Sequence, residues 1–383
     1  MVSTTTGFIV ALGVAVLLVR AAHSRQPGLL DPRGAGPQKF HGRDAPRVGG
    51  LAVALGLVTA LTVLAFRSGY EESARWGFLL ALAGAPVFAT GLAEDLTKKV
   101  RPRWRLLAAF VSAFLAVGVA GVVMVAPDLW GVAWLLSFPV VAVLLTAGVV
   151  ASLSHAVNLI DGFNGLASMC VVLMLAALAV VAYDIGDVVV GQLALVTIGA
   201  VLGFFILNYP AGLIFLGDGG AYFLGFWYAE LSLLLLARNP GELSPLFPVL
   251  VCVYPAFETI FSVYRRRIRG HAASQADGVH LHSLIYRRFL RWAVGDADAR
   301  ALTRSNSMTA PYLWLLSMSA VVPAVLFYEH TWVMLLFIAL FIVSYLVLYW
   351  RIVHFRTPGW IRHTTAVLAG RLEAARAEEG SGK

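Results

Sequence analysis

The feature that most constrains this chain is a series of long apolar runs separated by short polar steps. Hydrophobic residues make up 59% of the 383 residues and charged residues only 13%, about half the share that soluble domains carry. A run of roughly 20 apolar residues is the length that an α-helix needs to cross a bilayer. The sequence therefore predicts an all-α, polytopic integral membrane protein and excludes a soluble globular domain.

About eleven spanning helices are expected from these runs. They lie at residues 5–22, 48–66, 76–92, 105–126, 132–152, 166–184, 187–207, 217–237, 246–264, 310–328 and 331–350. Lys and Arg mark cytoplasmic loops, and with eleven spans 26 of the 29 Lys and Arg residues fall on one side. We therefore place the N-terminus outside and the C-terminus in the cytoplasm.

The chain is expected to form a single membrane-embedded domain over residues 1–350. A long basic loop at 265–309 and a tail at 351–383 lie on the cytoplasmic side. The basic residues behind the net charge of +8 then gather at the cytoplasmic surface of the membrane. This distribution suits anionic headgroups and phosphorylated substrates better than nucleic acid. The two cysteines both fall inside apolar helices, so no disulfide framework or Cys-based metal site is expected.

The segment from Asn158 to Gly165 places Asp161 between two apolar runs with no Lys or Arg nearby. A carboxylate in such a place is costly unless a cation, a ligand or a water-filled cavity stabilises it. The alternative is a polar turn exposed to water at the membrane surface.

A second acidic segment, Asn208 to Gly220, places Asp218 at a helix N-terminus among glycines that let a ligand approach the backbone. An ordinary N-cap is the alternative for Asp218. Neither acidic segment contains a basic residue, so a cation from outside the two segments is needed to neutralise their carboxylates. Oxygen ligands that are few in number suit Mg²⁺, or Mn²⁺, shared with a phosphate.

Three further motifs fall on the same side. Glu94 and Asp95 end the third apolar run, where they could bind a divalent ion or steer a proton, or simply form a solvated acidic pair. Lys39 and His41 precede the segment Pro46–Gly50, whose glycines also suit close helix packing.

The third of these motifs contains His280 and His282, which lie in the arginine-rich loop and suggest phosphate binding more than metal binding. All five motifs therefore gather at the cytoplasmic interface, beside the bilayer. This location implies a metal-bound phosphate site with one hydrophilic substrate and one lipid substrate.

In this order and spacing, the five motifs resemble the polyprenyl-phosphate N-acetylhexosamine-1-phosphate transferases, which form glycosyltransferase family 4. The resemblance covers roughly residues 38–300. It implies a Mg²⁺-dependent enzyme of the bacterial inner membrane that is active at the cytoplasmic face. Such an enzyme transfers a sugar 1-phosphate from a UDP-sugar to undecaprenyl phosphate, releases UMP and starts a lipid-linked envelope glycan such as O-antigen.

The resemblance also implies roles for individual residues. Asp218 and Asn158 match the metal site, and Phe215 and Asn208 match positions that hold the nucleotide. The basic pair and the His-x-His element match positions near the substrates; these are Lys39, His41, His280 and His282. The carboxylates expected to carry the chemistry are Glu94, Asp95, Asp161 and Asp218.

Three positions depart from the family pattern. Glu94 and Asn164 stand where relatives usually or often have Asp, and Ser283 stands where a third His is common. Asn164 is therefore expected to bind substrate rather than to act as a nucleophile. The missing triple-His signature argues against a peptidoglycan precursor and favours a simple N-acetylhexosamine, with GlcNAc as the default. A homodimer is left open, and the alternative function is a transporter or flippase for an anionic solute.

Overall fold

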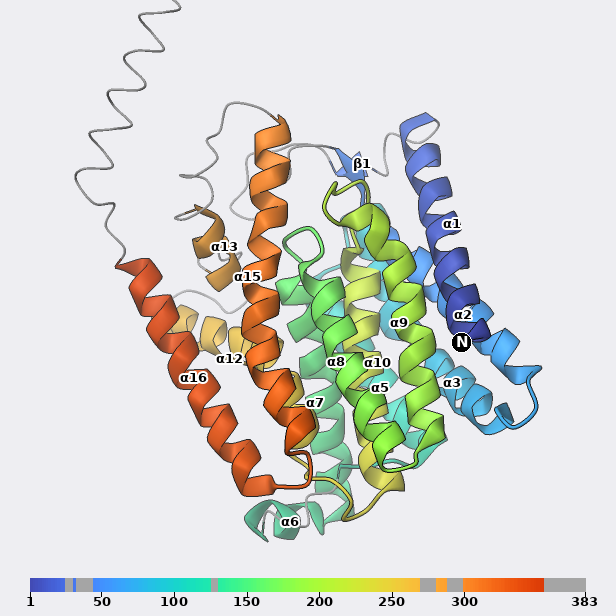
Figure 1. Ribbon diagram of the computed structural model, residues 1–383, viewed down its shortest axis with the longest axis vertical. Coiled ribbons are helices and arrows are strands. Elements are labelled where there is room, and N and C mark those ends of the chain that lie inside the picture. The colour runs from blue at the N-terminus through green and yellow to red at the C-terminus, as the bar shows by residue number, and fades with distance from the viewer. Residues whose placement is uncertain (25–29, 32–43, 125–129, 269–279, 288–298, 355–383) are drawn as a thin grey trace, which may run out of the picture. The chain divides into compact units, whose positions relative to one another are not determined.

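The computed structural model describes the chain except for residues 25–29, 32–43, 125–129, 269–279, 288–298 and 355–383. Its helices are α1 (Val2–Ser24), α2 (Gly49–Ala65), α3 (Glu71–Ala83), α4 (Ala85–Thr97), α5 (Pro102–Ala120), α6 (Trp130–Leu136), α7 (Pro139–Ile160), α8 (Leu166–Asp184), α9 (Val188–Asn208), α10 (Gly217–Arg238), α11 (Phe247–Val251), α12 (Val253–Ile268), α13 (Leu281–Ile285), α15 (Ala299–Leu326) and α16 (Thr331–Val353). The strands β1 (Leu30–Asp31) and β2 (Ala45–Pro46) form one short antiparallel pair (Figure 1).

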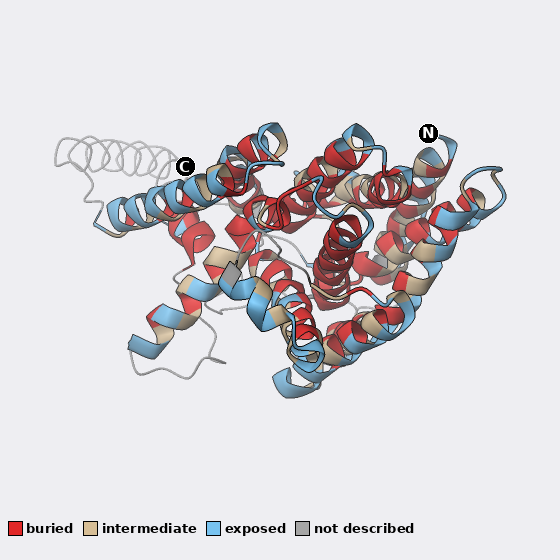
Figure 2. Ribbon diagram, turned by 90° about the horizontal axis from the view of Figure 1, so that it is seen from below, coloured by how far each residue is buried: buried red, intermediate tan, exposed pale blue. Residues whose placement is uncertain are grey.

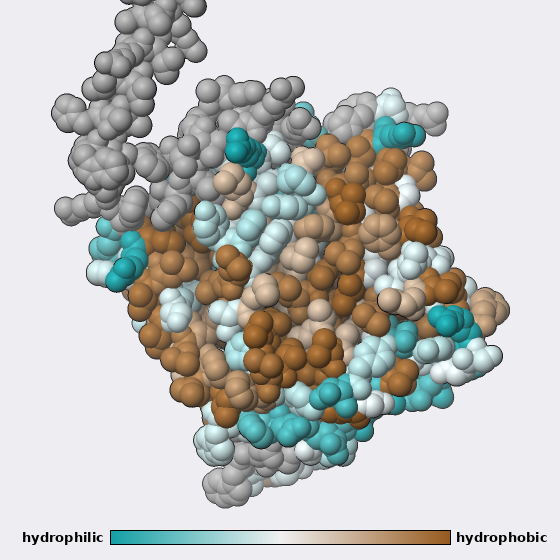
Figure 3. All heavy atoms as spheres, in the orientation of Figure 1, coloured by the Kyte–Doolittle hydropathy of each residue, from teal (hydrophilic) through white to brown (hydrophobic). Residues whose placement is uncertain are grey.

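The all-α, polytopic membrane class is confirmed. Among the described residues, eight helices are long and apolar enough to cross a membrane, and the pair α3 and α4, bent by 50° at Gly84, raises the number to nine. Apolar residues cover much of the face drawn in Figure 3, and hydrophilic ones gather toward the helix ends. The predicted orientation of the termini stays a prediction.

Several of the eleven expected spans differ in the structure, among them the second and the ninth. The segment expected at 48–66 is α2, an apolar helix of 17 residues that is shorter than a usual span. The segment expected at 246–264 is divided between α11 and α12 at Cys252. Pro255 explains this break, because it has no backbone N–H to donate to a carbonyl in the preceding turn.

The core is built around α10. Each residue from Gly217 to Leu236 is buried, and the helix packs against α7, α4 and α2. Figure 2 shows buried residues on the inner sides of the helices and exposed ones on the outer sides. Small residues permit this close packing. A Cβ on Gly50 would lie 2.4 Å from the Cα of Gly220, and one on Gly91 would lie 2.6 Å from the Cα of Gly219. The glycines after Pro46 therefore have the close-packing role that the sequence suggested.

Two compact units divide the chain, residues Met1–Ser344 and Tyr345–Lys383. The first contains all the motifs named above. The second begins inside α16, and its residues after 354 lie outside the described part of the chain. The predicted tail at 351–383 falls almost wholly in that outside part.

Candidate active site at the N-terminus of α10

Asp95 binds the first turn of α10 from the neighbouring helix α4. Its Oδ1 accepts the backbone N–H of Asp218 at 3.0 Å, and its Oδ2 accepts that of Gly219 at 2.9 Å. The first N–H groups of a helix have no partner within the helix, and the positive end of its dipole favours an anion. Asp95 thus fixes the start of α10 from outside it.

Gly217 makes this arrangement possible. Its φ is +80°, a conformation that glycine adopts without the strain that a side chain would cause. A Cβ there would lie 2.6 Å from Asp95 Oδ2 and 2.2 Å from the carbonyl oxygen of Arg47. The glycine of the Phe-Leu-Gly-Asp sequence is therefore required by both backbone geometry and space.

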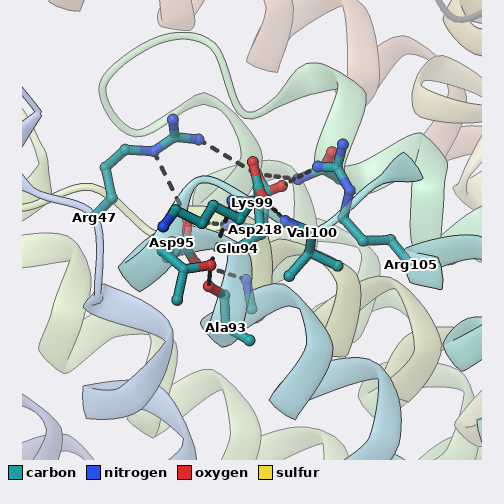
Figure 4. A network of polar contacts seen from close by, with 11 residues as sticks. Arg47, Ala93, Glu94, Asp95, Lys99, Val100, Arg105 and Asp218 are labelled. Atoms are coloured by element: carbon teal, nitrogen blue, oxygen red, sulfur yellow. Dashed lines mark hydrogen bonds and ion pairs between the residues drawn. The ribbon is translucent and has the colours of Figure 1, made fainter. Parts of the chain in front are cut away.

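The Asp218 carboxylate lies between two arginines (Figure 4). Arg47 donates to Oδ1 at 3.3 Å, and Arg105, in the first turn of α5, donates to Oδ2 at 2.5 Å. The amide of Asn158, in the last turn of α7, also donates to Oδ1 at 3.1 Å. Side chains from three other segments therefore meet at the carboxylate of Asp218, a residue that is only 7% exposed.

Backbone pairing holds Arg47 in place. The N–H of Phe215 donates to the Pro46 carbonyl at 2.9 Å, and the N–H of Gly49 returns a bond to the Phe215 carbonyl at 2.9 Å. The short segment before α2 therefore runs alongside the segment before α10. Phe215 itself is half-buried at this junction.

The two adjacent carboxylates of α4 have different surroundings. Glu94 is half-buried, and its Oε2 accepts the backbone N–H of Val100 at 2.8 Å, which closes the turn after α4 (Figure 4). Asp95 points to α10 instead. Of the two carboxylates predicted to be catalytic, Asp95 contacts the backbone at Asp218, whereas Glu94 contacts the turn after α4.

Asp161 ends α7 and lies in the same electrostatic environment. Removal from water raises the pKa of Asp161 to about 7, against the lowering effect of Arg47. The carboxylates of Asp218 and Asp95 raise it further, and a hydrogen bond from the Gly217 backbone lowers it. Asp161, Asp95 and Asp218 thus share one helix N-terminus, as the sequence predicted for Asp161 and Asp218.

Two buried amides brace the segments around these carboxylates. Asn208 accepts the N–H of Gly165 at 2.8 Å and donates to the Ile214 carbonyl at 2.8 Å. Asn164 donates to Ser307 Oγ on α15 at 3.0 Å, and its own N–H donates to the side chain of Asn306 at 2.8 Å. Their predicted contacts with substrate stay predictions, because most of these polar atoms already have protein partners.

The His-x-His element lies against the loop that contains Asp161. The rings of His280 and His282 stack with centroids 5.1 Å apart, and the His282 ring lies 5.3 Å from that of Phe163. His280 Nδ1 lies 3.1 Å from Oε1 of Glu258 on α12. Lys39 and His41, the remaining predicted pair, lie outside the described residues.

Three residues of this region were missed as site residues by the sequence reasoning. Arg47 lies in the segment Pro46–Gly50, for which the sequence suggests close helix packing, and Arg105 is one of the basic residues expected on the cytoplasmic side; both are bonded to Asp218. Glu258 was hidden inside an expected span. Both arginines lie at the start of an apolar run, and Arg105 also follows the Glu94–Asp95 motif, which is the sequence signal that could have indicated them.

The donor set suits a cation that arrives with a substrate. No group of three His, Cys, Asp or Glu side chains in the described residues has the arrangement of a metal site. Mg²⁺, however, often uses one or two carboxylates together with substrate phosphates. Removal from water is the main cause of the high pKa of Asp161, and the carboxylates of Asp218 and Asp95 add to it. A bound cation would favour the charged form of Asp161. Asp218 and Asp161, with the carbonyl of the Asn158 amide, could therefore hold a shared Mg²⁺.

Comparisons with known proteins place these residues in a wider context. The sequence model for glycosyl transferase family 4 matches residues 76–236. A probable undecaprenyl-phosphate N-acetylglucosaminyl 1-phosphate transferase of Bacillus subtilis (strain 168) is 31% identical over 268 residues, which cover 64% of this chain and 66% of that relative. The chain therefore spans about two thirds of that protein's length.

Two other relatives extend the match. A decaprenyl-phosphate N-acetylglucosaminephosphotransferase of Mycobacterium tuberculosis (strain ATCC 25618 / H37Rv) is 30% identical over 297 residues, covering 69% of this chain and 70% of the relative. An undecaprenyl-phosphate alpha-N-acetylglucosaminyl 1-phosphate transferase of Yersinia pestis is 26% identical over 355 residues, covering 90% and 89%. With its acidic motifs gathered at one helix N-terminus and similarity over most of its length, the chain belongs to glycosyl transferase family 4.

Proposed function

We propose that this protein transfers N-acetylhexosamine 1-phosphate, by default GlcNAc 1-phosphate, from a UDP-sugar to undecaprenyl phosphate. UMP is released, and the lipid product starts an envelope glycan such as O-antigen at the cytoplasmic face of the bacterial inner membrane. The observation that carries the proposal is the Asp218 carboxylate, held between Arg47 and Arg105 at the start of α10. The names of the relatives support the same reaction class.

The reaction joins two anions, so the site must supply positive charge more than a strong base. A phosphate monoester has a second pKa of about 6, and the lipid phosphate is therefore mostly ionised at neutral pH. Its oxygen attacks the β-phosphorus of the UDP-sugar, and the bond between that phosphorus and the oxygen bridging to the α-phosphorus breaks. The new diphosphate stays on the lipid, and the electron pair leaves with UMP.

Arg47 is the residue that we assign to the donor diphosphate. The segment carrying it is paired with the backbone of Phe215, whose half-buried ring is the predicted surface for uracil. A guanidinium binds phosphate oxygens in a bidentate manner. Arg47 could therefore move from Asp218 to the diphosphate without any change in the helices.

Arg105 is the residue that we assign to the lipid phosphate. It lies in the first turn of α5, a candidate span with large apolar side chains at its surface, among them Trp104, Leu107 and Phe114. Its buried Nε has no hydrogen-bond partner among the described residues, which leaves a donor for a phosphate oxygen. The lipid tail could then follow the apolar side of α5 while the phosphate binds Arg105, beside Asp218.

A Mg²⁺ ion held by Asp218 and Asp161 would supply neutralisation of the charge that develops on the diphosphate. We expect removal of divalent cations with EDTA to abolish transfer, and addition of Mg²⁺ or Mn²⁺ to restore it. The measurement is formation of labelled lipid product in detergent. Full activity after exhaustive chelation would remove the metal from the proposal.

The assignment of the arginines predicts opposite kinetic effects. Arg47→Lys should raise KM for the UDP-sugar about tenfold or more, since loss of a bidentate phosphate contact costs about 1.5–3 kcal/mol, and should leave KM for the lipid within about threefold. Arg105→Lys should show the reverse. Both KM values are measured with each substrate varied in turn. Equal effects of both variants on both KM values would contradict the division.

The reaction itself is tested with membranes that contain the protein, radiolabelled UDP-GlcNAc and undecaprenyl phosphate. A tunicamycin-sensitive, lipid-soluble product and an equal amount of UMP are expected. A panel of UDP-sugars then identifies the sugar. Uptake of label into sealed vesicles without any lipid product would favour the transporter alternative instead.

A further inference from the structure

Glu258 is a buried carboxylate to which the reaction proposed above gives no task. Its side chain on α12 is 0% exposed, and its Oε1 accepts the backbone N–H of Leu281 at 3.3 Å. The same oxygen lies 3.1 Å from Nδ1 of His280. Ser262, one turn further along α12, places its Oγ 3.0 Å from that ring nitrogen. Together these two side chains of α12 hold the start of α13.

This contact defines which ring nitrogen of His280 carries a proton. Because Oε1 of Glu258 already accepts the Leu281 N–H, it presents lone pairs to the imidazole as well. A lone pair on Nδ1 facing it would be repelled, so Nδ1 carries the hydrogen. The partner of one ring nitrogen thereby fixes the tautomer and the orientation of the whole ring. Nε2 is left as the atom that can meet another group.

Ring contacts connect His280, through His282, to the loop that contains Asp161. The ring planes of His280 and His282 are 18° apart, and the His282 ring also contacts Phe163, with the two ring planes at 63°. A Cβ on Gly162 would lie 3.5 Å from Nε2 of His282. Fixing His280 therefore also limits where His282 and the 161–163 segment can lie.

We propose that Glu258 is a positioning residue for phosphate transfer. It fixes the tautomer of His280, and through the stacked rings it holds both histidines of the His-x-His element against the Asp161 loop. This inference rests on the proposed function, in which His280 and His282 contact the phosphate-bearing substrates. A carboxylate that merely joined α12 to α13 would leave the same contacts, so the two roles must be separated by measurement.

A double-mutant cycle separates them. Glu258→Ala and His280→Ala are each expected to lower kcat/KM about 10- to 100-fold, the range found when a partner that orients a functional histidine is lost. If Glu258 acts through His280, the double variant should be about as active as His280→Ala alone. Losses that multiply in the double variant would overturn the inference.

Glu258→Gln and a matched control keep the result interpretable if Glu258→Ala folds poorly. The glutamine keeps an acceptor for Nδ1–H and should retain more activity than alanine. The control is Glu230→Gln on α10, where the carboxylate is 2% exposed and its Oε1 has no hydrogen-bond partner among the described residues. The control is expected to stay within about twofold of wild type, as for substitutions away from a functional contact.

The tautomer gives an independent readout. In protein labelled with ¹⁵N at histidine, the His280 signals are assigned by their absence in His280→Ala. The wild-type protein should show the Nδ1–H form, and Glu258→Ala should show a mixture of forms. A wild-type Nε2–H form would overturn the inference. A wild-type protein that makes no lipid product with any UDP-sugar would overturn the proposed function, and the inference with it.

Discussion

Asp218→Asn is expected to lower the rate of sugar-phosphate transfer by about a thousandfold or more, which corresponds to about 4 kcal/mol of transition-state stabilisation. The asparagine amide keeps the volume of the side chain and one acceptor oxygen, but it lacks the negative charge that pairs with Arg47 and Arg105. It also loses the proposed ligand for Mg²⁺. Initial rates of UMP release, measured on purified protein in detergent, give the result.

Asp184→Asn is the control for this variant. Asp184 lies at the far end of α8, where its carboxylate accepts the hydroxyl of Tyr328, and the substitution removes the same charge away from the site. Both variants should elute as folded protein in size-exclusion chromatography. Loss of one charge-stabilising group typically lowers the rate by about 10²–10³. A rate for Asp218→Asn within about tenfold of wild type would therefore exclude Asp218 from the reaction.

Asp95→Asn is expected to lower activity about 100-fold and to reduce the free energy of unfolding by about 1–3 kcal/mol. An asparagine can accept only one of the two N–H groups that Asp95 now accepts, and its own amide would face the other. The start of α10 would shift, and Asp218 with it. Thermal unfolding in detergent and transfer rates per folded protein measure the two effects.

Asp187→Asn provides a matched control at the other end of the bundle. Asp187 is buried, accepts the backbone N–H of Val190 at the start of α9 and pairs with Arg238. We expect a similar loss of stability but normal rates per folded protein. Equal losses of rate in both variants would mean that Asp95 acts only through the general stability of the fold.

The apolar helices were predictable because their pattern is local. The runs expected at 166–184 and 217–237 are α8 (Leu166–Asp184) and α10 (Gly217–Arg238). The run expected at 132–152 instead became α7 (Pro139–Ile160). The helix continues past Ser152 because Val157 and Ile160 are buried and Ser154 donates to the Tyr222 carbonyl at 2.7 Å. Asn158 is therefore on a helix rather than in a loop.

The site was predictable as a location but not as a set of contacts. Acidic motifs with no cation nearby in sequence predicted that Asp161 reaches the same face as Asp218, and the two carboxylates interact electrostatically in the structure. The cations that Asp218 does contact are supplied by Arg47 and Arg105, which are 171 and 113 residues away. The surroundings of Asn164 depend on Ser307 of α15, 143 residues further on. No local pattern contains such pairings, because tertiary packing creates them.

The length of α10 has a consequence for where the reaction takes place. From Asp218 to Arg238 the helix rises about 30 Å, which equals the thickness of the hydrocarbon core of a bilayer. Its far end is tied by Arg238 to Asp187 and Glu72, and its near end is tied by Asp95. In the proposed function α10 spans the bilayer, and its length would then place Asp218 at the level of the phosphate headgroups. The proposed lipid acceptor would reach the site by diffusing sideways in its own leaflet, with no need to lift out of the membrane.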